Sequence, residues 1–294
     1  MRGRPMRILA MDLGASKMQH GLRQGGRWSN MGRISIPRQM KTEELLALVS
    51  QLAGASKADC ICLSVPGFVV DGKLAGMPNI PRVDGKRFMQ GMRKLGIPFF
   101  IDNDVKCMAL AEWAARGKKE KDDFLLVAPG SGIGGAIVSR GRLVRGAHNT
   151  AGEVGHLKVG NGKGGWIDWE AGCSGFGIEG KFAKIGWDAK KILNSRNPGA
   201  RRLAAAAADC FGAGLAGLAN ALDPQEILVA GSVGREYMRN AKLRRAVLAA
   251  YAQNAIQPVK KTPVRCASLP YPALTGAALL GQGKKNAKTR RFLS

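Results

Sequence analysis

The chain has 294 residues, enough for one large domain or for two lobes that each bury a hydrophobic core. Hydrophobic residues make up 45% and charged residues 23%, which excludes wholesale disorder. The 46 Lys and Arg residues exceed the 21 Asp and Glu residues and give a formal net charge of +25. No stretch approaches the roughly 18 apolar residues that a membrane-spanning helix needs, so we expect no membrane partner.

The first part of the chain predicts strands that alternate with helices. Apolar runs predict strands over residues 8–13, 18–23, 28–36, 60–65 and 97–101. We expect a helix after Thr42, with Thr42 as its N-cap, and another over residues 105–116, directly behind Asp102-Asn103-Asp104.

The same pattern restarts after the polar connector at residues 117–123. We expect strands over residues 124–128, 133–139 and 226–230, and helices over 169–182 and 199–222. Each half therefore opens with an apolar strand, a glycine turn and a second strand. This alternation predicts α/β layers, and two similar halves predict a ligand in the cleft between them.

Glycine-rich turns follow three of the apolar strands, at residues 12–17, 130–135 and 231–234. Small residues at such turns leave backbone N–H groups free to approach phosphate oxygens. One such turn alone would be explained better as an ordinary hairpin, but three at strand ends favour a phosphate site. None matches the Walker P-loop, and none matches the Rossmann pattern that opens a helix.

Carboxylates stand where two of the strands end. Asp12, with Lys17 nearby, would hold Mg²⁺ through the water shell of the ion, or would cap the turn. Asp104 would act as a general base towards a substrate hydroxyl, or Asn103-Asp104 would cap the following helix. Position alone leaves both pairs of alternatives open.

Further polar residues surround glycine-rich loops in the second half. Glu153, His156, Asp168 and Glu170 are residue types that bind the hydroxyls of a polyhydroxylated ligand. A structural zinc at His156 would need nearby thiolates, and residues 157–168 contain none. The six cysteines form no CxxC pair, so we expect reduced thiols in a cytoplasmic protein.

Taken together, these motifs resemble the ROK family of sugar kinases, repressors and relatives, from Met6 to about Gly281. Residues 12–17 are similar to the family's first phosphate loop, DxGxTK, and residues 130–135 to the second, usually GTGIGGG. Asn103-Asp104, followed by Leu110 and Glu112, resembles the NDxxxxxLxE segment. Residues 145–156 resemble the RGxxxxAGExGH signature, which is the most specific match.

The resemblance implies a two-lobed actin-like fold of the α/β class, the hexokinase-type, ribonuclease H-like ATPase fold. Residues 1–117 would form an N-terminal lobe with the first phosphate loop and the catalytic aspartate. Residues 118–294 would form a C-terminal lobe with the second phosphate loop and the sugar and adenosine loops, and the last helix would pack back on the N-terminal lobe.

The resemblance also implies an ATP-dependent sugar kinase, which transfers the γ-phosphoryl group to a hydroxyl of a hexose or N-acetylhexosamine. Asp104 would be the catalytic base, and the sugar would be bound by Asn103, Glu153, His156 and Glu170. ATP and Mg²⁺ would be held by Asp12, Gly14, Ser16, Lys17, Gly130, Ser131, Gly132, Gly231 and Ser232.

One departure from the family concerns metal. Most members carry a CxCGxxGCxE zinc motif after the histidine, and residues 160–170 lack all three of its cysteines while Glu170 remains. We therefore expect no zinc, with Trp166 and Trp169 supplying packing in its place.

The net charge of +25 motivates an alternative: a non-catalytic sugar-sensing or nucleic-acid-binding protein on the same fold. The basic residues are spread widely, aromatic residues make up only 6%, and the first strand is predicted from Ile8, so we do not expect the winged helix of the family's repressors. We expect non-specific nucleic-acid contact at most, chiefly from the tail at residues 284–291, and a homodimer as the assembly.

Overall fold

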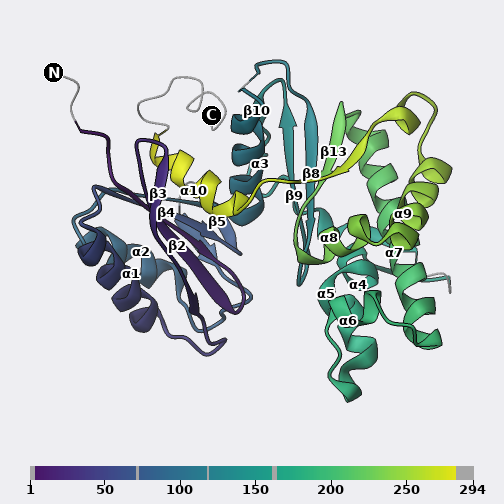
Figure 1. The fold of residues 1–294 in the computed structure, drawn as a ribbon, viewed down its shortest axis with the longest axis horizontal. Helices are drawn as coiled ribbons and strands as arrows, with labels where there is room; N and C mark the ends of the chain where they lie inside the picture. The colour runs from purple at the N-terminus through teal and green to yellow at the C-terminus, as the bar shows by residue number, and fades with distance from the viewer. Residues whose placement is uncertain (1–3, 71–72, 118, 161–163, 283–294) are drawn as a thin grey trace. The chain divides into compact units, whose positions relative to one another are not determined.

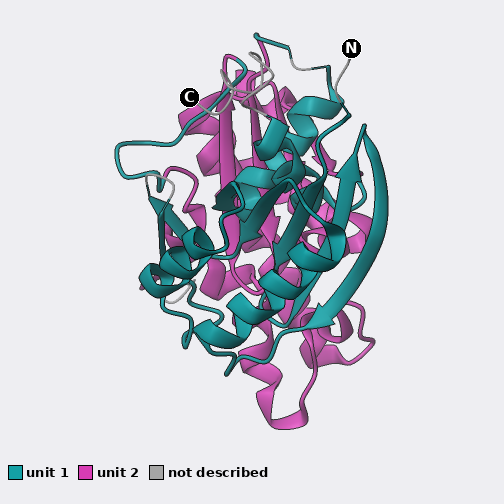
Figure 2. Ribbon diagram, turned by 90° about the vertical axis from the view of Figure 1, so that its left-hand side faces the viewer, with its two compact units in different colours: residues 1–120, 141–150, 269–294 teal, residues 121–140, 151–268 magenta. Residues whose placement is uncertain are grey.

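The computed structural model describes residues 4–70, 73–117, 119–160 and 164–282 (Figure 1). The chain forms two compact units, shown in separate colours in Figure 2. Unit 1 comprises residues 1–120, 141–150 and 269–294, and unit 2 comprises residues 121–140 and 151–268. The predicted basic tail at residues 284–291 lies outside the described residues.

Unit 1 is built on a five-stranded sheet of order β3-β2-β1-β4-β7. Its strand β1 pairs antiparallel with β2 and parallel with β4, and β4 pairs parallel with β7. The five strands are β1 (Ile8–Leu13), β2 (Lys17–Gln24), β3 (Arg27–Ser35), β4 (Cys60–Val65) and β7 (Phe99–Asn103). A two-stranded sheet joins β5 (Phe68–Val70) to β6 (Lys73–Gly76).

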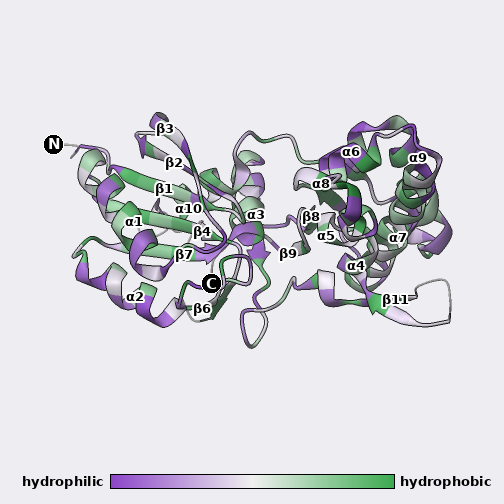
Figure 3. Ribbon diagram, turned by 90° about the horizontal axis from the view of Figure 1, so that it is seen from below, coloured by the Kyte–Doolittle hydropathy of each residue, from purple (hydrophilic) through white to green (hydrophobic). Residues whose placement is uncertain are grey.

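Helices cover both faces of this sheet. Helices α1 (Thr42–Ser56) and α2 (Gly85–Lys94) pack with Leu9 and Leu63 in one hydrophobic cluster. Helices α3 (Asp104–Ala115) and α10 (Pro272–Gln282) pack together, and α10 also contacts β1, β4 and β7. Because both faces are covered, β1 and β4 are almost continuously apolar, as Figure 3 shows.

Unit 2 repeats the strand order around β8. The second sheet has the order β10-β9-β8-β13-β14, in which β8 pairs antiparallel with β9 and parallel with β13. Its strands are β8 (Phe124–Pro129), β9 (Ile133–Ser139), β13 (Glu226–Val229) and β14 (Val264–Cys266), with the edge strand β10 (Arg142–Leu143), whose residues belong to unit 1 in the division above. A separate hairpin pairs β11 (Lys158–Gly160) with β12 (Trp166–Asp168).

Six α-helices and three short 3₁₀ helices are described in unit 2. The α-helices are α4 (Trp169–Cys173), α5 (Gly175–Glu179), α6 (Ala189–Leu193), α7 (Pro198–Leu222), α8 (Ser232–Arg239) and α9 (Ala241–Asn254). The 3₁₀ helices span Val154–His156, Gly180–Ile185 and Pro258–Lys261.

Helix α7 corrects the expectation that no segment is apolar and long enough for a membrane. By length and composition alone its 25 residues would suffice, and half of its most apolar window is buried inside the unit. Phe211 of α7 stacks on Trp169 with the ring centroids 5.6 Å apart, and on Tyr237 at 5.1 Å. The apolar character of α7 is therefore explained by its central place in the unit 2 core.

Strands and helices agree with the predicted alternation, which confirms the α/β class, but three local predictions are wrong. Lys41, not Thr42, is the N-cap of α1, because the Thr42 hydroxyl accepts a hydrogen bond from the Asp84 backbone N–H at 2.9 Å instead. The helix expected over residues 169–182 is broken at Ser174, whose hydroxyl caps α5. The third glycine turn is shorter than expected, since α8 begins at Ser232 directly after Gly231 at φ +74°.

Candidate functional site

In unit 1, a row of polar side chains crosses the carboxyl ends of three neighbouring strands. Asp12 of β1 is in register with Ser64 of β4, and Ser64 is in register with Asp102 of β7. The Ser64 hydroxyl donates to Asp12 Oδ1 at 2.8 Å. Burial raises the pKa of Asp12, while the Ser64 hydrogen bond and the Lys17 charge oppose that rise.

Asn103 and Asp104 occupy the junction of β7 and α3, as predicted. The Asn103 side chain caps α3, because its Oδ1 accepts from the backbone N–H groups of Val105 at 3.0 Å and Lys106 at 3.3 Å. Its Nδ2 donates to the Gly67 carbonyl at 3.2 Å. The capping alternative therefore holds for Asn103, while Asp104 is the first residue of the helix and is half-buried.

Three carboxylates gather near one buried thiol in this part of unit 1. Burial raises the pKa of Cys107 well above its ordinary value, and the charges of Asp102, Asp12 and Asp104 raise it further. The structure thus brings Asp12 and Asp104, which lie 92 residues apart in the sequence, into one region of unit 1.

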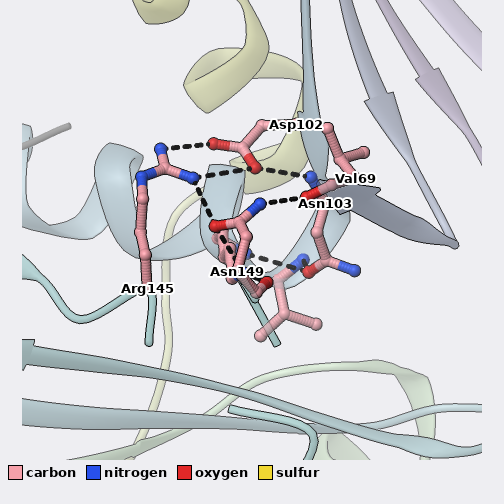
Figure 4. Close-up of polar contacts among 7 residues, drawn as sticks. Val69, Asp102, Asn103, Arg145 and Asn149 are labelled. Atoms are coloured by element: carbon pink, nitrogen blue, oxygen red, sulfur yellow. Dashed lines mark hydrogen bonds and ion pairs between the residues drawn. The ribbon is translucent and has the colours of Figure 1, made fainter. Parts of the chain in front are cut away.

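Sequence reasoning missed the partners of Asp102. This carboxylate, whose side chain is only 5% exposed, forms an ion pair with Arg145, with Oδ2 and Nη2 2.8 Å apart. Arg145 also donates to Asn149 Oδ1 at 2.9 Å, and Asn149 donates to the Val69 carbonyl (Figure 4). Arg145 lies in the signature described above, but the signature does not indicate which residue Arg145 binds. The only available signal was the general rule that a buried carboxylate such as Asp102 needs a cationic partner.

The first glycine turn closes tightly, with the Gly14 N–H donating to the Lys17 carbonyl at 2.8 Å. The side chains of Ser16 and Lys17 are exposed, whereas Gly14 is half-buried. This turn therefore presents a hydroxyl and an ammonium to solvent close to the half-buried Asp12.

The second glycine turn is held by backbone bonds on both sides. The Gly130 N–H donates to the Gly132 carbonyl at 2.9 Å, and the Gly175 N–H donates to the Gly130 carbonyl at 2.8 Å. Glu170 Oε2 accepts from the Ile133 N–H at 3.1 Å, and a Cβ on Gly132 would lie 2.6 Å from that oxygen. A side chain at position 132 would therefore force the Glu170 carboxylate to move.

The predicted sugar-binding residues of unit 2 lie around the same turn. A Cβ on Gly155, between Glu153 and His156, would lie 2.9 Å from Glu170 Oε2, so the signature loop also contacts Glu170. His156 Nδ1 is 3.8 Å from Asp168 Oδ2, and Asp168 forms an ion pair with Lys158. The Lys158 hydrogen bond lowers the pKa of Asp168, and Lys158 is a neighbour that the motifs did not reveal.

The second and third glycine turns border one cavity of about 240 Å³ within unit 2. Gly130 and Ser131 contribute from one turn, and Ser232 contributes from the start of α8. The remaining polar lining consists of Glu179, Asp188, Lys190 and Glu236. Of all the residues that line the cavity, only Gly130, Ser131 and Ser232 were predicted from the sequence as binding residues.

Two expectations concern the segment that replaces the zinc motif. Among the described residues, no group of three or more His, Cys, Asp and Glu side chains could hold a metal ion, and residues 161–163 fall outside that search. The expected lack of zinc stays a prediction. The packing role expected of Trp166 is wrong, because its side chain is 75% exposed, whereas Trp169 is fully buried and donates to the Cys210 carbonyl at 3.0 Å.

Two sheets with the same strand order, each opening with a strand-turn-strand unit, define a two-lobed actin-like ATPase fold of the hexokinase type. Residues 8–284 match the sequence model of the ROK family, and the chain belongs to this family.

Similar proteins include a bifunctional enzyme and kinases, and the solved structures with the same fold also include a ROK family transcriptional regulator. The chain is 31% identical over 246 residues to the bifunctional enzyme NanE/NanK of Brucella melitensis, covering 77% of this chain but 45% of that protein. It is 28% identical over 245 residues to a beta-glucoside kinase of Klebsiella pneumoniae, covering 78% of this chain and 82% of the kinase. The crystal structure of a ROK hexokinase from Thermus thermophilus matches with a TM-score of 0.76 and 28% identity, over 96% of this chain and 100% of that one.

Proposed function

We propose that the protein is an ATP-dependent sugar kinase that transfers the γ-phosphoryl group to a hydroxyl of a hexose or N-acetylhexosamine. The observation that carries the proposal is the row of Asp12, Ser64 and Asp102 in register at the strand ends of unit 1, with Asp104 at the start of α3 two residues after Asp102, in a chain of the ROK family. The kinases among its relatives support the same reaction class.

Asp104 is the proposed base. It stands at the first turn of α3, a helix of 12 residues, whose N-terminus carries partial positive charge. An ionised carboxylate can accept the proton of the attacking sugar hydroxyl, which is the usual role of a general base in such a transfer. The first unit would thus supply the base and the first phosphate loop.

The acceptor sugar would be oriented by residues of unit 2. Glu153, His156 and Glu170 offer acceptors and one imidazole within the region around the second glycine turn. Asn103 would contribute only through its Nδ2 group, since its Oδ1 is already used by two backbone N–H groups of α3. Orientation of this kind provides much of the rate of phosphoryl transfer.

The cavity beside Ser131 and Ser232 supports a nucleotide, rather than polyphosphate, as the donor. Three carboxylates, Glu179, Asp188 and Glu236, line it against one ammonium, Lys190. Such a lining suits a nucleoside, which offers hydroxyls and amino groups, and would repel a continued chain of phosphates. The backbone N–H groups of Gly130 to Gly132 would then hold the phosphates, together with Gly14, Ser16 and Lys17.

Magnesium fits the residues of unit 1. Asp12 is a half-buried carboxylate beside the Ser64 hydroxyl, and Mg²⁺ usually takes one or two carboxylates while it keeps several waters. When bound with ATP, the ion would neutralise charge on the phosphates.

We place the enzyme in the cytoplasm as a homodimer, with non-specific nucleic-acid contact at most.

The decisive experiment is a sugar panel assayed with ATP and with polyphosphate as donors, with ADP release and sugar phosphate measured separately. We expect sugar-dependent turnover with ATP and little with polyphosphate. Sugar-independent background, together with salt-sensitive binding of a defined DNA duplex at nanomolar concentration, would favour the non-catalytic alternative that the +25 charge motivates.

A further inference from the structure

A short loop in unit 1, residues 145–149, is tied to the three elements β5, β7 and α3, and Figure 4 shows its contacts with Val69 and Asp102. Arg145 pairs with Asp102 of β7, the residue two positions before Asp104. Asn149 donates its side-chain amide to the carbonyl of Val69 in β5. Lys106, two positions after Asp104 and 3% exposed, donates its ammonium to the backbone carbonyl and to Oδ1 of Asn149.

The loop is therefore anchored on both sides of Asp104 in the sequence. Asp102 Oδ1 also accepts from the Asn103 backbone N–H at 2.9 Å, so the carboxylate that binds Arg145 also holds the junction between strand and helix. A buried carboxylate without its cation would be strongly unfavourable, which makes Arg145 necessary wherever Asp102 stays ionised.

Asn149 has a side chain suited to this task. Its Oδ1 accepts from Arg145 and Lys106 while its Nδ2 donates, so both ends of the amide are used. Its backbone has a φ of +56°, a left-handed conformation that asparagine tolerates better than most residues. The side-chain bonds and the left-handed backbone can be separated experimentally, because Asn149→Gly keeps the backbone conformation and removes the side chain.

We propose that Arg145 and Asn149 are positioning residues that hold the first turn of α3, and with it Asp104, in the geometry needed for proton transfer. This inference rests on the proposed sugar kinase function. Displacement of a reacting group by about 1 Å can lower a rate about 100-fold, so a loosened first turn would act on kcat. The cavity proposed for the nucleoside is lined by residues of unit 2, and the first glycine turn is closed by its own bond from Gly14 to Lys17, so KM for ATP would stay unchanged.

The test uses the full chain with three variants. Asn149→Gly removes the side-chain clamp, Arg145→Lys keeps the charge but loses the two-pronged contact, and Asn30→Gly is the matched control at an exposed asparagine of φ +50°. Steady-state kinetics give kcat and both KM values. Hydrogen exchange of the peptide that contains residues 103–108 reports the first turn of α3 independently of activity.

We expect Asn149→Gly to lower kcat about 10- to 100-fold with unchanged KM for ATP and faster exchange in the first turn of α3. Arg145→Lys should fall between this variant and the wild type, and Asn30→Gly should match the wild type. Wild-type kcat in Asn149→Gly, or a lower kcat with unaltered exchange, would overturn the positioning role. A wild-type chain that phosphorylates no sugar would overturn the proposed function and this role together, whatever the exchange shows.

Discussion

In unit 1 the turn between β1 and β2 follows the half-buried Asp12 and ends in the exposed Lys17, whereas the turn between β8 and β9 in unit 2 follows Pro129 and carries no charged side chain. Both turns close with one backbone hydrogen bond, from Gly14 to Lys17 in the first and from Gly130 to Gly132 in the second. The second turn is also held from outside by Glu170 and by the start of α5, whereas the first is held from outside by the Ile36 N–H, which donates to the Ser16 carbonyl at 2.9 Å.

The difference shows how one local backbone pattern can serve two purposes. The same strand order and the same antiparallel opening pair recur in both sheets. What each turn can bind depends on the residues beside it: charged side chains in unit 1 and backbone N–H groups in unit 2. Substitutions that remove a charge should therefore lower activity most in unit 1, and substitutions that add side-chain volume should lower activity most in unit 2.

The largest effect is expected from the charge of Asp104. Asp104→Asn should lower kcat by about 10²–10⁴-fold with sugar binding largely kept, because an amide cannot take the hydroxyl proton. Steady-state kinetics and sugar binding by calorimetry would measure both. Asp84→Asn, at the N-cap of α2, is the matched control and should retain wild-type kcat. More than half of wild-type kcat in Asp104→Asn would rule out this residue as the base.

The second prediction concerns added side-chain volume in the second glycine turn, in unit 2. Gly132→Ala would place a Cβ 2.6 Å from Glu170 Oε2, so the carboxylate must move away from the Ile133 N–H. We expect kcat/KM for the sugar to fall about 10- to 100-fold. Gly180→Ala, where no heavy atom lies within 4 Å of the new Cβ, is the control. Equal kinetics for both variants would show that Glu170 adjusts freely.

A third prediction concerns the packing that holds α4, the helix of Glu170. On α7, a Cβ at Gly214 would lie 2.1 Å from the Trp169 ring, whereas a Cβ at Gly217 meets nothing within 4 Å. Gly214→Ala should lower the free energy of unfolding by about 1–3 kcal/mol through overpacking. Gly217→Ala should raise it by about 0.4–1 kcal/mol. Urea denaturation of both would measure the contrast, and stability changes of the same sign would contradict it.

The smallest effect concerns charge at the edge of unit 1. The Arg7 side chain and backbone, with the Arg4 charge, lower the pKa of Asp59 from 3.8 to about 2. The folded state therefore favours the ionised form, and this stabilisation is present above about pH 4 and disappears as the pH falls towards 2. Asp59→Asn should flatten the acid side of the stability curve over that interval. A wild-type and a variant curve that stay parallel from pH 5 to 2 would contradict this.

The places of the candidate residues in the fold were predictable because these residues stand in local patterns. Asp12 follows an apolar strand and precedes a glycine turn, and Asn103-Asp104 stands between a strand and a helix. Such patterns depend on neighbours in the sequence, so their placement at strand ends follows from periodicity. The partners of Asp102 could not be found this way, since Arg145 lies 43 residues further along the chain.

The sequence by itself determined the alternation of strands and helices, the two similar openings and the positions of the glycine turns, because side-chain periodicity and glycine conformations are local properties. Only the tertiary structure decided that Thr42 bonds to Asp84 rather than capping α1, and that Ser174 starts a new helix within residues 169–182. It also decided that Trp169 is buried while Trp166 is exposed. These outcomes depend on which distant groups approach each side chain, and packing between elements sets that approach.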